Sequence, residues 1–238
     1  MTQIYDFLIY NPFLNILIFF YNTIAFNDLG LAIIFLTILI RIILFPVFQK
    51  MLELQLAIQK IQPELKEIQN KYKKDPQKQI QETINLYKKN RINPIMMYLF
   101  LIIQLPILIA LFQIFSQNFA NNNSLLGLYS FVYKPETINI LFLDLINLEK
   151  PSIILAVLAA GFQYAQSFIS IYVFKESYQQ INKILLYLGS GITLVFGLYL
   201  PAAVTLYLLI SNIISFIQQI FINKKFIKQK ENELGRVY

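Results

Sequence analysis

The fold of this chain is decided by residues 29–48, which read LGLAIIFLTILIRIILFPVF. A helix rises about 1.5 Å per residue, so about 20 residues cross the roughly 30 Å hydrocarbon core of a bilayer. Arg41 is the one charged residue of this stretch, and nearly all the others are apolar. We therefore predict a membrane-spanning helix with an arginine embedded in it.

The whole 238-residue chain has the composition of a membrane protein, with 57% hydrophobic and 14% charged residues. Its mean hydropathy of +0.55 is too high for an ordinary water-soluble globule. Besides residues 29–48, four uncharged segments are long enough to span a bilayer: 94–115, 151–174, 184–200 and 202–222. The sequence therefore predicts an all-α, polytopic membrane protein with five transmembrane helices.

The distribution of positive charge predicts the orientation, because loops rich in Lys and Arg stay in the cytoplasm. Residues 1–40 hold no Lys or Arg, whereas residues 41–93 hold eleven. With the N-terminus outside and the C-terminus inside, five spans place eighteen of the twenty cations in the cytoplasm or at the inner end of a span.

Three regions follow from this topology. Residues 1–27 form an N-terminal extracytoplasmic segment, residues 28–222 a five-helix core, and residues 223–238 a basic cytoplasmic tail. Within the first region, residues 7–26 carry no charge but are interrupted by Asn and Pro. We interpret them as an interfacial helix on the outer face or an uncleaved signal-like segment, with a sixth span as the alternative.

A cytoplasmic helical hairpin is predicted at residues 51–91, inside the long polar stretch between the first two spans. Its first arm has heptad-spaced apolar residues, and Pro63 predicts a kink or a fresh helix start within it. Asp75 before Pro76 predicts a helix N-cap, and Ile80, Ile84 and Tyr87 continue the apolar seam on a second, antiparallel helix. The lysine-rich outer face is either simply solvated or contacts anionic lipid headgroups or ribosomal RNA. The heptad positions are Leu54, Ile58, Ile61, Leu65, Ile68 and Tyr72.

Arg41 is the most informative residue, because a guanidinium near the bilayer centre costs about 3 kcal/mol on insertion scales. None of the five predicted spans contains an Asp or Glu, which argues against a buried ion pair. Either the side chain reaches the inner headgroups by snorkelling, or it lines a cavity that is open to water. We favour the cavity. Its candidate polar lining is Thr37, Gln104, Gln163, Gln166, Ser211, Asn212 and Ser215, each of which could instead make an interhelical hydrogen bond.

The residue types that are absent from the sequence exclude several classes of function. The chain has no Cys and no His, so thiol nucleophiles, Cys/His zinc sites and His general bases are excluded. No intramembrane Asp, Glu or His is present in the predicted spans to carry a transported proton. We therefore predict that the protein is not an enzyme and uses no cofactor or metal.

Several short motifs, in their order along residues 28–222, resemble the YidC/Oxa/Alb-type membrane protein insertases. They are Gly30-Leu-Ala-Ile-Ile34 leading to Arg41, Leu44-Phe45-Pro46, Ile61-Gln62-Pro63-Glu64-Leu65, Lys71-Tyr72-Lys73, Leu86-Tyr87-Lys88, Asn93-Pro94, Gln104-Leu105-Pro106-Ile107, Ala110-Leu111, Phe142-Leu143-Asp144-Leu145, Pro201-Ala202, Leu206-Tyr207, Ser211-Asn212 and Gln218-Gln219.

This resemblance implies a hydrophilic groove in the inner leaflet, closed toward the outside and lined by Arg41, with Gln166 as the best match to the family's third-span glutamine. It implies insertase and chaperone activity in the bacterial cytoplasmic membrane. The polar tail of a nascent membrane protein would enter the groove while its apolar helix slides along spans three and five into lipid. The hairpin and the basic tail would receive the nascent membrane protein, the ribosome or the Sec translocon. Membrane lipids are further partners, and DNA is not one.

Two other functions stay open from the residues alone. A small anion channel or carrier would use Arg41 as its binding site and would open to both sides. A passive assembly scaffold would tolerate loss of the Arg41 charge but would need residues 51–91.

Overall fold

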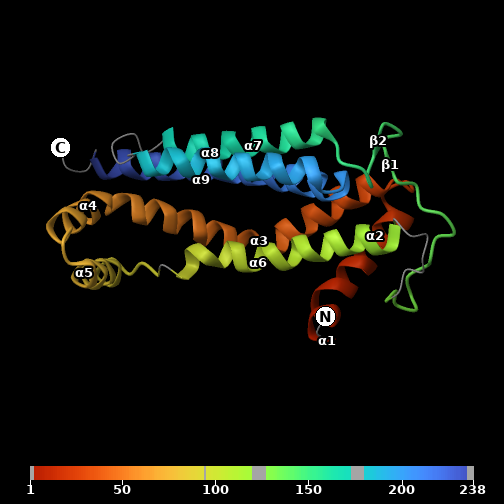
Figure 1. The fold of residues 1–238 in the computed structure, drawn as a ribbon, viewed down its shortest axis with the longest axis horizontal. Coiled ribbons are helices and arrows are strands. Elements are labelled where there is room, and N and C mark those ends of the chain that lie inside the picture. Colours follow the sequence, from red (N-terminus) through yellow and green to blue (C-terminus); the bar gives the residue numbers. More distant parts are fainter. Residues whose placement is uncertain (1–2, 94, 120–126, 173–179, 235–238) are drawn as a thin grey trace.

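The structure is a computed structural model that describes residues 3–93, 95–119, 127–172 and 180–234. The predicted all-α class is confirmed in its main feature, since most of these residues are helical. The long helices of the described ranges lie side by side along the longest axis (Figure 1). They are α3 (Leu29–Lys60), α6 (Ile95–Gln113), α7 (Ile153–Tyr172), α8 (Gln180–Tyr199) and α9 (Ala202–Leu234).

Each predicted span coincides with one of these helices, but two helices extend well beyond the predicted bounds. Helix α3 passes through Pro46 and ends at Lys60, because apolar residues such as Leu52 and Leu56 keep its buried face continuous. Helix α9 continues past residue 222 to Leu234. Within the described ranges, the stretches Leu29–Ile58 and Ala202–Lys224 are long and apolar enough to cross a membrane. The shorter apolar stretches are Ile102–Ser116, Ile153–Ile169 and Tyr187–Tyr199.

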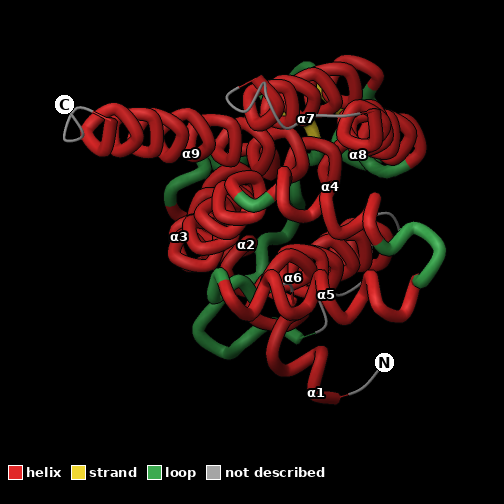
Figure 2. The backbone as a smooth tube through the Cα atoms, turned by 90° about the vertical axis from the view of Figure 1, so that its left-hand side faces the viewer, coloured by secondary structure: helices red, strands yellow, loops and turns green. Residues whose placement is uncertain are grey.

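Helix α9 is central to the packing. Figure 2, which looks along the bundle, shows α9 between α7 and α3, and both of these helices pack against it. Helix α8 packs mainly on α7, and α6 packs on α3. The hydrophobic core therefore combines side chains from α3, α6, α7 and α9.

The N-terminal segment packs into this same core. The short α1 (Gln3–Tyr5) and the π-helical turn η1 (Asp6–Tyr10) lead into α2 (Asn11–Thr23). Leu14, Leu17 and Ile18 of α2 are fully buried. Helix α2 packs against α3, so residues 11–23 form part of one hydrophobic cluster with the long helices.

Polar residues of α2 fix the loop that follows α6 and its π-helical extension η2 (Ile114–Phe119). The Asn15 side chain donates to Gly127 O at 2.8 Å and accepts from Tyr129 N at 2.7 Å. Tyr21 Oη accepts from Asn139 N at 2.9 Å. These bonds hold residues 127–139 against the N-terminal helix at one end of the bundle.

A small antiparallel hairpin, β1 (Leu141–Phe142) and β2 (Ile146–Asn147), also lies at this end and was not predicted. Leu143 and Asp144 form its turn in the left-handed conformation, with φ of 51° and 58°. The Phe142 ring packs directly on Gly30 at the start of α3, where no larger residue fits without displacing the ring. Two-residue strands leave too short an apolar pattern for sequence-based prediction.

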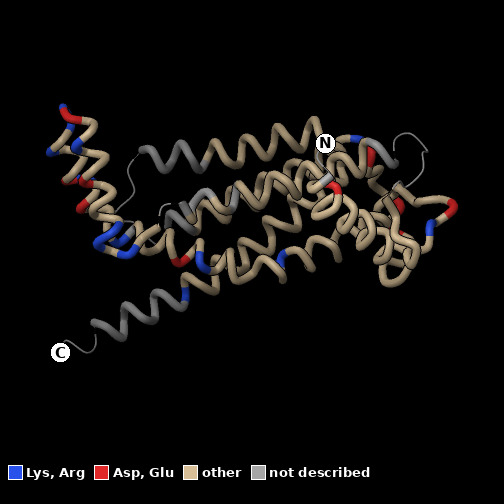
Figure 3. Tube along the Cα trace, turned by 90° about the horizontal axis from the view of Figure 1, so that it is seen from below, with Lys and Arg blue, Asp and Glu red and all other residues tan. Residues whose placement is uncertain are grey.

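The opposite end carries the predicted hairpin, built from the end of α3, α4 (Gln62–Lys71) and α5 (Pro76–Lys89). Lys and Arg residues gather at this end, whereas the other end carries few (Figure 3). A fresh helix begins at Gln62, next to Pro63, and Asp75 is the predicted N-cap, accepting from Lys78 N at 3.1 Å. Ile61, Leu65, Leu86 and Ile92 form a separate small core.

The predicted seam of the second hairpin helix was wrong at two of its three residues, whereas Tyr87 packs against this small core as predicted. Ile80 and Ile84 are 61% and 44% exposed, and Leu86 is buried in their place. Figure 1 looks almost along the axis of α5 while α3 runs across the picture, so α5 crosses the end of α3 and does not lie antiparallel to it. The face of α5 that packs on α4 is therefore the one that carries Leu86, and not the one that carries Ile80 and Ile84.

Candidate functional site

Arg41 lies in the middle of the apolar part of α3 and is only 4% exposed. Its guanidinium carbon lies 4.2 Å from the centre of the Phe48 ring, and its Nη1 atom has no hydrogen-bond partner. No carboxylate pairs with Arg41 within the described ranges. A buried, unpaired cation is costly, so this position is unfavourable for stability and points to function.

A polar contact between α6 and α9 lies beside this arginine. Gln104 Nε2 donates to Tyr207 Oη at 3.0 Å, and Tyr207 is almost fully buried and lies near Arg41. Arg41, Gln104 and Tyr207 thus join three helices in one polar cluster. Sequence reasoning chose Gln104 but missed Tyr207 and Phe48 as site residues. Phe48 could have been found from its spacing, because a residue seven positions after Arg41 lies on the same helix face.

Thr37 and Ser211 lie one helical turn from members of this cluster. Thr37 is fully buried one turn before Arg41, and its hydroxyl donates to Ile33 O of its own helix at 2.7 Å. Ser211 is 1% exposed and lies one turn after Tyr207 on α9, and its Oγ has no hydrogen-bond partner. The structure therefore gathers part of the predicted set around α3, α6 and α9.

The remaining predicted residues lie on the α7 side of the bundle. Asn212 Nδ2 donates to Ala159 O at 3.0 Å and joins α9 to α7. Gln163 points toward α8, where its Nε2 atom lies 3.7 Å from the place a Cβ on Gly189 would occupy. Gln166 is half-buried on α7. Asn212 therefore contacts α7, and Gln163 lies beside α8.

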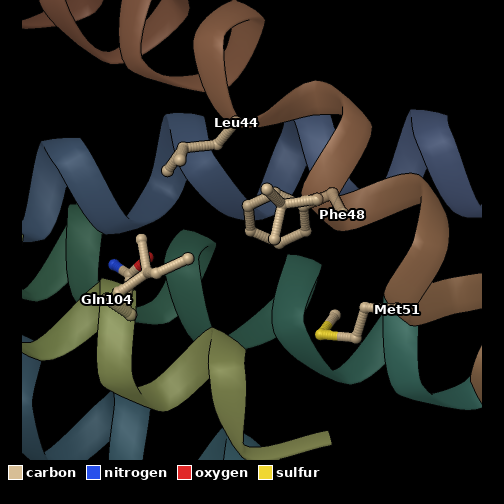
Figure 4. Close-up of a pocket in the computed structure, with 6 residues that line it drawn as sticks. Leu44, Phe48, Met51 and Gln104 are labelled. Carbon is tan, nitrogen blue, oxygen red and sulfur yellow. The ribbon is translucent and has the colours of Figure 1, made fainter. Parts of the chain in front are cut away.

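A pocket next to Arg41 is lined by Leu44, Val47, Phe48 and Met51 of α3 and by Ile103 and Gln104 of α6. Figure 4 shows Phe48, Leu44 and Met51 around it, with Gln104 at one side. Apart from Gln104 this lining is apolar. The predicted opening of the Arg41 cavity to water stays a prediction, because Phe48 covers the guanidinium in this conformation.

Within the described ranges, no group of three or more His, Cys, Asp or Glu side chains could hold a metal ion. The chemistry that this site offers is electrostatic and hydrogen-bonding: one cation, one phenol, one amide and one hydroxyl enclosed by apolar helices.

The fold and this cluster define a class, namely helical membrane proteins that enclose a polar, cationic site within an otherwise apolar bundle. Residues 19–230 match the model of the 60Kd inner membrane protein family, and the chain belongs to that family.

Named relatives agree with this assignment. The chain is 35% identical over 220 residues to membrane protein insertase YidC 1 of Listeria monocytogenes serotype 4b, an alignment covering 87% of this chain and 70% of the relative. It is 34% identical over 214 residues to membrane protein insertase YidC of Clostridium perfringens, covering 84% and 82% of the two chains. It is 42% identical over 135 residues to the Clostridium tetani protein of that name, covering 57% and 54%.

Proposed function

We propose that this chain is a membrane protein insertase and chaperone of the bacterial inner membrane. The observation that carries the proposal is Arg41, a buried cation with an unpartnered Nη1 atom beside Tyr207 and Gln104. An interaction site of this kind lowers the desolvation cost of a polar segment that enters the bilayer. Family membership and the names of the relatives support the same function.

In this proposal five helices, α3, α6, α7, α8 and α9, span the membrane with the N-terminus outside. The cations of α4 and α5 stay in the cytoplasm, as the charge distribution favours. The short polar tail of a nascent membrane protein enters from the cytoplasm, displaces Phe48 and contacts Arg41. Its apolar helix then moves along α7 and α9 into lipid. The hairpin 51–91 receives the client from the ribosome or the Sec translocon.

The packing favours a groove with one opening over a channel or carrier. Leu29, Ile33 and Leu36, which precede Arg41 on α3, are at most 1% exposed. Leu14, Leu17 and Ile18 of α2 belong to the same cluster. This apolar layer lies between Arg41 and the end predicted to face outside, where a transport pathway would need polar groups.

The test is insertion by the purified chain in vesicles that contain no other insertase. A client with one apolar helix and a short uncharged N-terminal tail should insert, so that its tail becomes protected from external protease. The Arg41→Ala variant should insert much less of this client. Insertion by the wild type no higher than in empty vesicles would refute the proposed function.

A further inference from the structure

Two buried polar atoms lie far from the Arg41 cluster. Four side-chain atoms in the described ranges are buried without a hydrogen-bond partner: Arg41 Nη1, Ser211 Oγ, Gln218 Oε1 and Asn223 Nδ2. The first two belong to the site already described. Asn223 is sixteen residues after Tyr207 on α9, which is about 24 Å along the helix axis. Gln218 and Asn223 therefore need a different explanation.

Three buried amide side chains, named here the amide cluster, lie within six residues of one another near the end of the apolar stretch of α9. Gln218, Gln219 and Asn223 are 9%, 2% and 2% exposed. Gln219 Nε2 donates to Asn223 Oδ1 at 2.9 Å, which fixes the Asn223 amide and leaves its Nδ2 atom available. Buried polar groups are nearly always paired, because leaving one unpaired is costly. The unpaired Asn223 Nδ2 suits a carbonyl group of a ligand, and the unpaired Gln218 Oε1 suits an N–H group.

The depth of the cluster indicates where that ligand lies. The apolar stretch of α9 runs from Ala202 to Lys224, so the cluster lies at its cytoplasmic end. Helices α7 and α9 run parallel here, because Asn212 bonds to Ala159 and the rings of Phe162 and Phe216 are 6.0 Å apart. The same register places Gln166 of α7 level with Gln219. The cluster is therefore at the level where a membrane-spanning helix of similar length ends.

The chemistry of helix ends matches this cluster. The first four N–H groups and the last four C=O groups of a helix have no partner within the helix. In a bilayer these groups need partners, because unpaired backbone groups in hydrocarbon are costly. A carboxamide offers both a donor and an acceptor and carries no charge. It therefore suits neutral peptide groups better than ions, whereas Arg41 suits anionic groups.

We infer that Gln218, Gln219 and Asn223 form a capping site for the unpaired peptide groups at the cytoplasmic end of a client helix. The inference rests on the proposed insertase function and adds a second, uncharged contact to it. Arg41 receives the polar tail, and the amide cluster holds the helix end while the helix leaves α7 and α9 for lipid. For a client with its N-terminus outside, the free groups at that end are carbonyls, which Asn223 Nδ2 can bind.

Site-specific photo-crosslinking tests the contact. A photo-activatable phenylalanine analogue is placed at Gln218, at Asn223 or at Thr37, and a stalled client is bound in vesicles. Ile217 and Phe221, which are 46% and 69% exposed on the same helix, are the matched control positions. Crosslinks from 218 and 223 should map to the last turn of the client helix. Crosslinks from 218 and 223 only to lipid, or to the whole tail without preference, would overturn the inference.

Isosteric apolar variants test the chemistry. Gln218→Met removes one unpaired atom and keeps the volume. Asn223→Leu removes the other and is combined with Gln219→Met, so that Gln219 Nε2 is not left without its acceptor. Ile217→Met is the control. Because the unpaired atoms are lost, the melting temperature should stay the same or rise. Insertion should nevertheless slow about 3- to 10-fold, the equivalent of one lost hydrogen bond. Unchanged insertion, or a fall in melting temperature that accounts for the slower insertion, would overturn the inference.

The two proposals fail differently. If Thr37 crosslinks to the client while 218 and 223 do not, and the isosteric variants insert normally, the capping site is refuted and the insertase function stands. If the wild type inserts nothing in the same vesicles, the insertase function itself is refuted.

Discussion

The guanidinium carbon of Arg41 lies 4.2 Å from the centre of the Phe48 ring, on the same helix and about two turns earlier. A cation–π contact of this kind contributes about 0.5–2 kcal/mol, more when it is desolvated. This contact stabilises the guanidinium only partly, because a carboxylate or a carbonyl group binds a guanidinium more strongly than an aromatic ring does. In the proposed function, the Phe48 ring is the side chain that a polar group of the client would replace at Arg41.

Replacing Phe48 should uncover the site. In a Thr37→Cys background, which is otherwise cysteine-free, Phe48→Leu should speed labelling by a cytoplasmic thiol reagent about fivefold, reflecting about 1 kcal/mol of lost contact. Phe45→Leu is the control, because Phe45 is 48% exposed on the same helix. Equal labelling rates in the two variants would show that Phe48 does not cover the cavity.

The charge of Arg41 should matter for function and oppose stability. Arg41→Met should raise the melting temperature in detergent, because an unpaired buried cation is removed. The same variant should insert a short-tailed client at least about tenfold more slowly, while Arg41→Lys retains part of the activity. Insertion rates and thermal melts of the three proteins check this. If Arg41→Met and Arg41→Lys both complement cells depleted of their own insertase as well as the wild type, the charge is not essential.

The Gln104–Tyr207 bond should be energetically coupled. Tyr207→Phe leaves the part-buried Gln104 Nε2 without its partner, which should destabilise the protein by about 1 kcal/mol. Gln104→Met in the Tyr207→Phe background should recover much of this loss. A double-mutant cycle on unfolding free energies measures the coupling. Additive effects would indicate that the two side chains do not depend on each other.

Labelling from the two sides of the membrane should separate a groove from a pathway. Thr37→Cys and Ser211→Cys should react only with reagent added on the cytoplasmic side, because the apolar layer of α2 and the first half of α3 closes the other side. Modification of either cysteine from outside would favour the channel or carrier. Ile153→Cys, at an exposed position at the outer end of α7, is the control for outside access.

The tight contact between Gly30 and Phe142 should be sensitive to one methyl group. Gly30→Ala places a Cβ where the Phe142 ring lies, so the outer hairpin must shift and the melting temperature should fall. Phe142→Ala in the Gly30→Ala background should relieve part of that loss. Thermal melts of the single and double variants check this, and no change in Gly30→Ala would show that the contact is loose.

Local signals in the sequence predicted local features well. The apolar stretches gave the positions of the long helices, and Asp75 before Pro76 gave the N-cap that the structure confirms. What the sequence could not supply is the rotation of each helix about its axis, which packing decides. Gln163 therefore points to α8 although its spacing suits the groove, and Ile80 is exposed although its spacing suits a seam. Tyr207 was missed because a tyrosine among apolar residues has no distinctive pattern.

Asp28 connects the start of α3 to the outer hairpin through both carboxylate oxygens. Oδ1 accepts from Leu31 N at 3.0 Å, and Oδ2 accepts from Leu143 N at 2.8 Å. These two hydrogen bonds therefore anchor the N-terminal end of α3 to the outer hairpin. A tilt of about 5° about Asp28 moves Lys60, roughly 48 Å away, by about 4 Å, but moves Arg41 by less than about 2 Å. A tilt of α3 about this anchor would therefore displace its Lys60 end more than twice as far as Arg41.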